Sequence, residues 1–143
     1  MTSYLLDVNV LISLIDFDHQ HHSRSRGWFN RRELHAWHTS PTVESGALRI
    51  SMNKHVLGDR FTAAMIIGAI GNLTALPGWT LIPEDISILD ASIFDHDHIT
   101  SRHQVTDTYL LALAARHDAI LATLDQKLAT TAVKLPNAKV HVI

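Results

Sequence analysis

The sequence predicts an α/β domain built around a central, mostly parallel sheet. Short apolar runs alternate along the chain with segments in which apolar residues recur at helical spacing, as in parallel strands joined by helices. Two of the apolar runs end directly in a carboxylate, that of Asp7 and that of Asp125. The chain has 143 residues, the usual size of one domain, and no internal repeat or long linker. We therefore expect a single domain over residues 1–143.

The N-terminal part predicts one strand and two helices. The strand covers Ser3–Leu6 and ends at Asp7. A helix should follow, because apolar residues recur at positions 10, 11, 14 and 15. The polar, His-rich segment 17–35 is expected to form a second helix with Trp28 and Phe29 on its buried face.

Two further helices are expected in the middle of the chain. One begins at Pro41 with Ser40 as its N-cap, because proline suits a first helical turn and a serine oxygen accepts from free N–H groups there. Glu44 lies one turn into this helix, among small residues that allow close backbone packing. A longer apolar helix is expected from about Arg60 to Leu73, capped by Asp59.

The C-terminal half continues the alternation of strands and helices. After the break at Pro77-Gly78, the pattern predicts a strand over Thr80–Ile82, a short helix over Ile86–Phe94, a helix that opens at Thr106-Asp107, a strand over Ala119–Leu124, a short helix after Asp125 and a closing strand over Lys139–Ile143.

The amino-acid composition excludes several classes of protein for this chain. The absence of cysteine excludes disulfide scaffolds and thiolate zinc sites. No apolar run reaches the roughly 18 to 20 residues of a membrane span, and the N-terminus lacks the basic region of a secretory signal. We therefore expect a soluble, cytoplasmic protein with no membrane partner. The net charge is −2, yet the stretch from Arg24 to Arg60 holds seven basic residues against three acidic ones.

The acidic residues at the predicted strand ends point to one edge of the sheet. Ligands of an open parallel sheet bind at the carboxyl ends of its strands, where Asp7 and Asp125 are expected. Asp107 opens a helix, and helix N-termini lie at that same edge. Glu44 lies in the first turn of another helix. Alone, each of these residues has an ordinary alternative role as a helix cap or a surface residue.

Clustered carboxylates need a counter-charge, because like charges raise one another's pKa values. Hard divalent cations with oxygen ligands, Mg²⁺ or Mn²⁺, supply it. Such an ion can bind a phosphate oxygen and stabilise charge on a leaving oxygen. The residues themselves therefore indicate metal-dependent phosphodiester hydrolysis.

Four sequence blocks, in order over essentially the whole chain, resemble the signature blocks of PIN-domain ribonucleases: Leu5-Leu-Asp-Val-Asn-Val-Leu11, Thr42-Val-Glu44, Val105-Thr-Asp-Thr-Tyr-Leu-Leu-Ala-Leu-Ala114 and Ala122-Thr-Leu-Asp125. Within that family the chain is similar to the VapC toxins of bacterial VapBC type II toxin–antitoxin modules, and Trp37–Ile50 resembles an actinobacterial subgroup. It departs from many relatives in the Gln-Lys-Leu that follows Asp125, where a second acid and a phenylalanine are common.

The resemblance implies a PIN-like three-layer α/β/α sandwich and Mg²⁺- or Mn²⁺-dependent cleavage of RNA, with tRNA or rRNA as expected substrates. It implies a homodimer and a cognate VapB-type antitoxin, which inhibits the toxin by filling the active-site groove within a toxin–antitoxin hetero-oligomer. The residues that match the family's catalytic and metal-binding acids are Asp7, Glu44, Asp107 and Asp125. The residues that match its supporting polar positions are Asn9 and Thr123.

Two other functions remain open from the sequence. A phosphatase of the haloacid-dehalogenase type would use Asp7 as a covalent nucleophile, but such enzymes normally carry a second Asp where this chain has Asn9. A PIN-like module that only binds a partner would need no acids, and this chain carries all four.

The histidines and tryptophans allow more than one interpretation. The run His19-Gln-His21-His22 is a candidate transition-metal site, a solvated helix start or, when protonated, a source of positive charge for RNA. Trp28 and Trp37 are candidates for base stacking or for the core.

Overall fold

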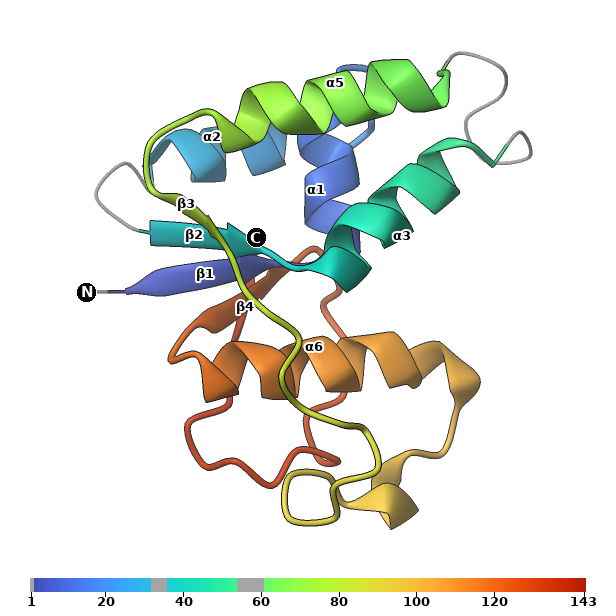
Figure 1. Cartoon of the computed structure of the whole chain (residues 1–143), viewed down its shortest axis with the longest axis vertical. Helices are drawn as coiled ribbons and strands as arrows, with labels where there is room; N and C mark the ends of the chain where they lie inside the picture. Colours follow the sequence, from blue (N-terminus) through green and yellow to red (C-terminus); the bar gives the residue numbers. More distant parts are fainter. Residues whose placement is uncertain (1, 32–35, 54–60) are drawn as a thin grey trace.

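The computed structural model describes residues 2–31, 36–53 and 61–143, and within them one sheet forms the centre of the molecule (Figure 1). Its strands are all parallel and lie in the order β3-β2-β1-β4-β5. The strands are β1 (Ser3–Leu6), β2 (Ala36–Thr39), β3 (Trp79–Leu81), β4 (Ile120–Thr123) and β5 (Val140–Val142). The predicted α/β class with a parallel sheet is confirmed, and β1 occupies its middle.

Helices cover both faces of this sheet. One face carries α1 (Val8–Ile15), α2 (His22–Arg31), α3 (Pro41–Ser51) and α5 (Ala63–Thr74). The other carries α6 (Val105–Arg116) together with long connections that include the short 3-10 helices η1 (His96–His98) and η2 (Arg102–Gln104) (Figure 1). This is the three-layer α/β/α arrangement that the family resemblance implies. No helix in the described segments has the length and apolar character needed to cross a bilayer.

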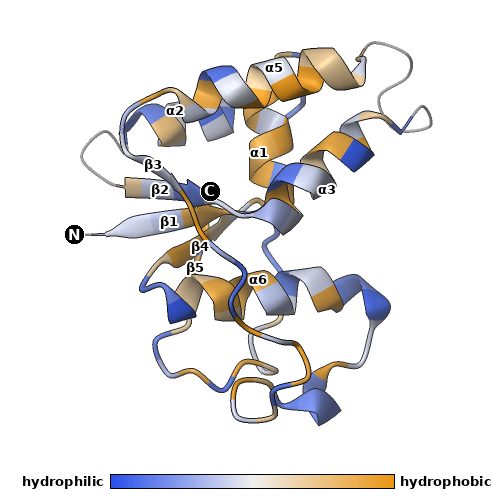
Figure 2. Cartoon of the chain, viewed as in Figure 1, coloured by the Kyte–Doolittle hydropathy of each residue, from blue (hydrophilic) through white to orange (hydrophobic). Residues whose placement is uncertain are grey.

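Helix α1 lies between the sheet and α5, and its composition fits that place. It is apolar along almost its whole length (Figure 2), and every residue from Val10 to Leu14 is buried. Its first N–H groups need a partner, and the carboxylate of Asp7 accepts from the Val8 N–H at 2.7 Å. The residue that directly follows β1 therefore also caps the start of the central helix.

Helix α3 begins as predicted. Ser40 is its N-cap, with the side chain accepting from the Val43 N–H at 3.4 Å, and Pro41 opens the first turn. Gly46 allows α3 to approach α1, because a Cβ at this position would lie 3.1 Å from a methyl group of Val8. Close packing of these two helices brings the far end of α3 over the start of α1.

The aromatic residues of the N-terminal half belong to the core. Trp37 is fully buried and Trp28 is 9% exposed. Phe29 meets Trp37 edge to face with ring centroids 5.0 Å apart, and Tyr4 meets Trp28 in the same way at 5.1 Å. Both tryptophans are packing residues, so the structure leaves no role for them in base stacking.

Several predicted elements differ from the structure. Helix α5 begins at Ala63, with the Thr62 side chain accepting from the Met65 N–H at 3.2 Å, whereas the predicted cap Asp59 and the predicted start Arg60 lie outside the described residues. Strand β2 was not predicted, because in the run Ala36–Thr39 only Trp37 is a large apolar residue on the buried side.

The predicted helix over Ile86–Phe94 is wrong. This stretch forms turns, because side-chain oxygens take N–H groups that a helix would need: Asp90 accepts from the Ser92 N–H at 2.9 Å and Ser87 from the Leu89 N–H at 3.1 Å. The short helix predicted after Asp125 is also a turn, in which the Asp125 carboxylate accepts from the Lys127 N–H at 2.9 Å.

The C-terminus of α6 reverses the chain directly into β4. Asp118 has a φ of 55°, the left-handed conformation that ends many helices. The N–H of Ala119 then donates to the carbonyl of Ala114 at 2.8 Å, which closes the last turn. This reversal places β4 beside β1 with Leu6 opposite Ala122.

Candidate active site

The candidate site lies where the chain's connections diverge from the central strand. After β1 the chain forms α1 and α2 and continues into β2, the neighbour of β1 on one side. The neighbour on the other side, β4, is reached only after α6, which lies on the opposite face of the sheet. Crevices at such switch points, outside the carboxyl ends of the strands, are the usual ligand sites of open α/β sheets. Asp7 continues the pairing by donating its N–H to the carbonyl of Ala122 at 2.9 Å. Asp125 follows β4 by two residues.

Asp7 is a buried carboxylate with both oxygens engaged. It is 3% exposed, Oδ1 accepts from the Val8 N–H at 2.7 Å, and Oδ2 accepts from the Thr123 hydroxyl at 2.7 Å. Burial raises the pKa of Asp7, the two hydrogen bonds oppose that rise, and the charge of Asp125 adds to it. The carboxylate is therefore held in one orientation at an electrostatic cost.

Thr123 is the centre of a small polar network at the end of β4. Besides donating to Asp7, its oxygen accepts from the Asp125 N–H at 3.1 Å and lies 3.3 Å from the Asn9 Nδ2 donor. The Asn9 Oδ1 accepts from the Leu124 N–H at 3.1 Å. Asn9 and Thr123 thus join the β1–α1 junction to the β4 end, which fixes Asp7 relative to Asp125.

Asp107 reaches the same place from α6. It lies in the first turn of that helix. Burial raises the pKa of Asp107 to about 6, and the charges of Asp7 and Asp125 add to the rise. The three aspartates that the sequence places at one edge are therefore close enough to disfavour one another's charge.

Glu44 lies apart from these aspartates. Its Oε2 accepts from the Thr39 hydroxyl at 2.8 Å, and Thr39 also accepts from the indole N–H of Trp79 at 3.0 Å. The glutamate lines a groove whose other walls include Leu48 of α3 and Ile67 of α5. The structure thus places Glu44 on the face of α3 that meets α5, away from the face that meets α1.

A cleft of about 390 Å³ opens at the aspartates. Apolar side chains make up part of its wall, and its polar lining includes two residues outside the predicted set, His19 and Arg49. The lining residues are Asp7, Val8, Asn9, Ile12, His19, Arg49, Ile50, Thr106 and Asp107. In the sequence, Arg49 stands out only as part of the basic stretch and His19 only as part of the His-rich segment.

The donor set of this cleft fits a hard divalent cation. Asp7 and Asp107 line the cleft, Asp125 follows β4 nearby, and the charges of Asp7 and Asp125 add to the rise in the pKa of Asp107. Within the described ranges, no three acidic, histidine or cysteine side chains converge closely enough to enclose an ion. Mg²⁺ needs no such enclosure, because it retains several waters and binds through one or two carboxylates.

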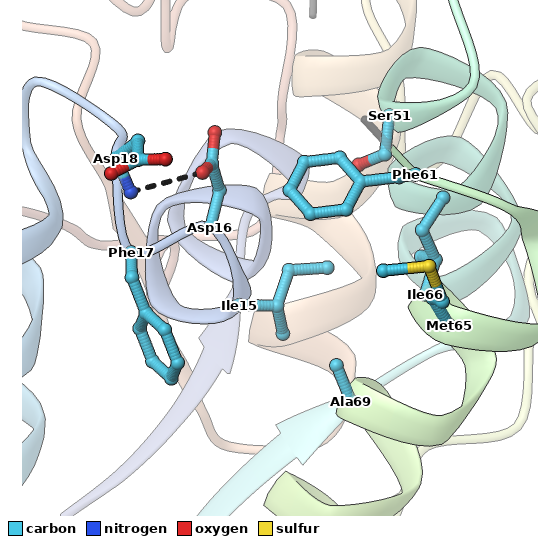
Figure 3. A pocket seen from close by; sticks show the side chains of 9 residues that line it. All are labelled: Ile15, Asp16, Phe17, Asp18, Ser51, Phe61, Met65, Ile66 and Ala69. Atoms are coloured by element: carbon cyan, nitrogen blue, oxygen red, sulfur yellow. Dashed lines mark hydrogen bonds between the residues drawn. The ribbon is translucent and has the colours of Figure 1, made fainter. Parts of the chain in front are cut away.

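An apolar hollow, also of about 390 Å³, lies between the end of α1 and the start of α5 (Figure 3). Its wall contains Ile15, Phe61 and Met65, and Asp16 lies at its rim, where it accepts from the Asp18 N–H at 3.0 Å. Phe17 is 80% exposed beside it. Such a combination of a hollow and an exposed aromatic ring is typical of a protein-binding surface.

Known proteins match this chain over nearly its whole length. The PIN domain family model matches residues 4–134. Ribonuclease VapC39 of Mycobacterium tuberculosis is 40% identical over 128 residues, which cover 90% of this chain and 92% of the relative. Ribonuclease VapC44 of the same species is 36% identical over 133 residues, 90% of each chain.

Two crystal structures share the fold. M. tuberculosis VapC20, described as a toxin that cleaves the sarcin–ricin loop, superposes with a TM-score of 0.62 at 10% identity, over 90% of this chain and 94% of its own. VapBC2 of Rickettsia felis, bound to a DNA fragment from its promoter, superposes with a TM-score of 0.61 at 14% identity, over 99% of both chains.

Proposed function

Because the chain belongs to the PIN-domain family, as a VapC ribonuclease toxin of a VapBC toxin–antitoxin module, we propose that it hydrolyses RNA with a divalent metal ion at the aspartate cleft. One observation supports this proposal above the others: Asp7, Asp107 and Asp125 come from three separate parts of the chain, at the switch point of the sheet, and lie near enough for their charges to disfavour one another. Their mutual repulsion costs stability, and a bound cation would offset it.

Asp7 and Asp107 would hold the Mg²⁺ or Mn²⁺ most directly, with Asp125 completing the site. When bound, the ion supplies positive charge for the phosphate and for the oxygen that leaves. The chain's own residues do the positioning. Thr123 and Asn9 fix the orientation of Asp7 and the end of β4, whereas Ile12 and Ile50 form an apolar part of the cleft wall. In the hydrolysis, a water forms a new P–O bond, the P–O bond to the leaving oxygen breaks, and the proton that the water loses ends on the leaving oxygen.

Glu44 belongs to the proposed site through the family match, and its role there differs from that of the aspartates. Its hydrogen bond to Thr39 ties the start of α3 to the end of β2. We assign it a supporting role at the edge of the site.

The substrates we propose are structured RNAs, tRNA or rRNA. The structural neighbour that cleaves the sarcin–ricin loop acts on such an RNA. Inducing expression in a bacterial host and mapping the new RNA 5′ ends would identify the target. Purified protein should cleave that RNA with Mg²⁺ or Mn²⁺, lose activity in EDTA and regain it when the ion returns. Full activity in EDTA would refute the metal-dependent mechanism.

A VapB-type antitoxin is the partner we propose, in a hetero-oligomer built on a toxin homodimer. The Rickettsia felis structure contains both partners of such a module. We propose that the antitoxin inhibits the enzyme by filling the aspartate cleft and inserts apolar side chains into the hollow beside Phe17.

The phosphatase alternative fits the geometry poorly. At the position where such enzymes carry their second Asp, this chain has Asn9, whose amide is engaged with the Thr123 hydroxyl and the Leu124 N–H. Trapping of an aspartyl-phosphate on Asp7 would restore this alternative. A purely binding module would be supported by protein that cleaves no RNA with either ion.

A further inference from the structure

Arg49 lines the cleft together with Asp7 and Asp107, yet it pairs with neither. It lies in the last turn of α3 and is exposed. Among the described residues it makes no ion pair and no side-chain hydrogen bond. The charges that act on Asp107 are those of Asp7 and Asp125, and both raise its pKa. The guanidinium therefore does not neutralise the carboxylates and keeps its donors for another group.

His19 adds a second donor to the same wall. Its Nδ1 accepts from the backbone N–H of His21 at 3.0 Å, so the proton of the neutral ring is on Nε2. Burial lowers the pKa of His19, and His21 and His22 lower it further against the opposing charge of Asp16. At neutral pH the ring is thus an uncharged N–H donor.

The two donors suit an anion with several oxygens. A guanidinium binds phosphate through two parallel N–H groups, and a neutral imidazole N–H adds a third hydrogen bond without further charge. An RNA strand brings a phosphate at every nucleotide, so one phosphate can face the metal-binding aspartates while its neighbour meets Arg49.

We propose that Arg49, with the Nε2–H of His19, binds an RNA backbone phosphate next to the phosphodiester that is cleaved. The inference rests on the proposed function, because it assumes RNA in the aspartate cleft. Arg49 is then a positioning residue that reads no base, and it sets the register of the strand relative to Asp7 and Asp107.

Binding can be measured without cleavage. We would use Asp107→Asn protein in EDTA and a fluorescein-labelled oligouridine of about 12 nucleotides, with anisotropy titrations from about 50 to about 200 mM salt. The variants are Arg49→Gln, Arg49→Lys and His19→Asn in that background. The matched control is Arg116→Gln, which removes the same charge from an exposed residue. Arg116 is in the last turn of α6, at the opposite end of that helix from position 107 in its first turn. Circular dichroism checks that each variant is folded.

The salt dependence is the decisive readout. Arg49→Gln should weaken binding roughly tenfold and reduce the slope of log K against log salt by about 0.7, the value for one phosphate contact on a single strand. Arg49→Lys keeps the charge and should keep the slope. His19→Asn should weaken binding with no change of slope, and Arg116→Gln should change neither quantity.

Two results would overturn the inference. One is a slope for Arg49→Gln equal to that for Arg116→Gln, and the other is no oligouridine binding by the parent protein. Cleavage of cellular RNA by the unmodified chain with Mg²⁺ is measured in parallel. If cleavage is present while either result holds, the phosphate site is wrong and the proposed function stands. If cleavage is absent, the proposed function itself fails.

Discussion

The hydroxyl of Thr123 donates a 2.7 Å hydrogen bond to Oδ2 of Asp7, across 116 residues of sequence. Thr123→Val removes this donor and leaves a buried carboxylate oxygen without a partner. We expect RNA cleavage to fall about 10- to 100-fold and the free energy of unfolding to drop by about 1–3 kcal/mol. Single-turnover cleavage and urea unfolding would measure the two effects.

Thr123→Ser is the matched control, because it keeps the hydroxyl and loses one methyl group. It should retain most of the activity. Equal cleavage by the serine and valine variants would show that the orientation of Asp7 does not depend on this bond.

A second prediction concerns pH and the metal-free protein. The pKa of Asp107 in the folded protein is about 6, above the ordinary aspartate value of 3.8, so the folded chain binds more protons than the unfolded chain between these values. The contribution of Asp107 to stability is therefore full below about pH 3.8 and is lost as the pH rises to about 6. Asp107→Asn should remove this loss of stability with rising pH, because asparagine does not ionise. Its thermal midpoint at pH 7 in EDTA should exceed that of the parent chain by a few degrees, while RNA cleavage with Mg²⁺ is abolished.

Unfolding scans from pH 4 to pH 7 would check the sign of this effect. A lower thermal midpoint for Asp107→Asn at pH 7 would contradict it. Asp125→Asn is informative here as well, because it should lower the pKa of Asp107, which carboxyl NMR can follow.

The position of Glu44 leads to a third prediction. Its carboxylate contacts Thr39 and lines the groove toward α5, so Glu44→Gln should reduce cleavage by less than tenfold, whereas Asp7→Asn should reduce it by at least about a hundredfold. Both changes remove one negative charge, which makes the pair well matched. A loss of equal size in the two variants would mean that Glu44 turns into the cleft when RNA or metal binds.

A fourth prediction tests the reversal between α6 and β4. Asp118 adopts a φ of 55°, which is unfavourable for a residue with a Cβ and costs glycine nothing. Asp118→Gly should therefore raise the free energy of unfolding by about 0.5–1 kcal/mol, as measured in urea. Asp118→Ala keeps the strained backbone and should give no gain. A similar gain for alanine would assign the effect to the side chain instead.

The hollow beside Phe17 provides a fifth prediction. Phe17→Ser together with Met65→Ser should weaken the complex with the antitoxin at least tenfold by calorimetry, since both side chains are more than half exposed in the free chain. RNA cleavage by the free toxin should not change. The control is Leu89→Ser, which also removes an exposed apolar side chain, 82% exposed, and lies outside this hollow. Antitoxin affinity equal to that of the control would rule out the hollow as the docking surface.

The aspartates were predictable from the sequence because their placement depends on local order. An apolar run that ends in Asp7 or Asp125 places the carboxylate at a strand end, and parallel strands bring those ends together. Asp107 was predictable for the same reason, since a helix that leads into the next strand starts at that edge.

The remaining features depend on which face of a helix meets which neighbour. Glu44 and Arg49 are on the same helix, and the packing of α3 against α1, close at Gly46 and Val8, leaves Arg49 in the wall of the cleft and Glu44 in the groove toward α5. The turns over Ile86–Phe94 were missed because short side chains there compete with the helix for backbone N–H groups, which apolar spacing does not reveal.

The central place of β1 has a consequence for the cell that makes this protein. During synthesis β1 is made before β4, its partner on one side, and 116 residues separate Asp7 from Thr123. Until β4 has been made, Asp7 lacks both Thr123 and the carboxylates of the C-terminal half. A ribosome that has made only the N-terminal half therefore carries no assembled aspartate cleft.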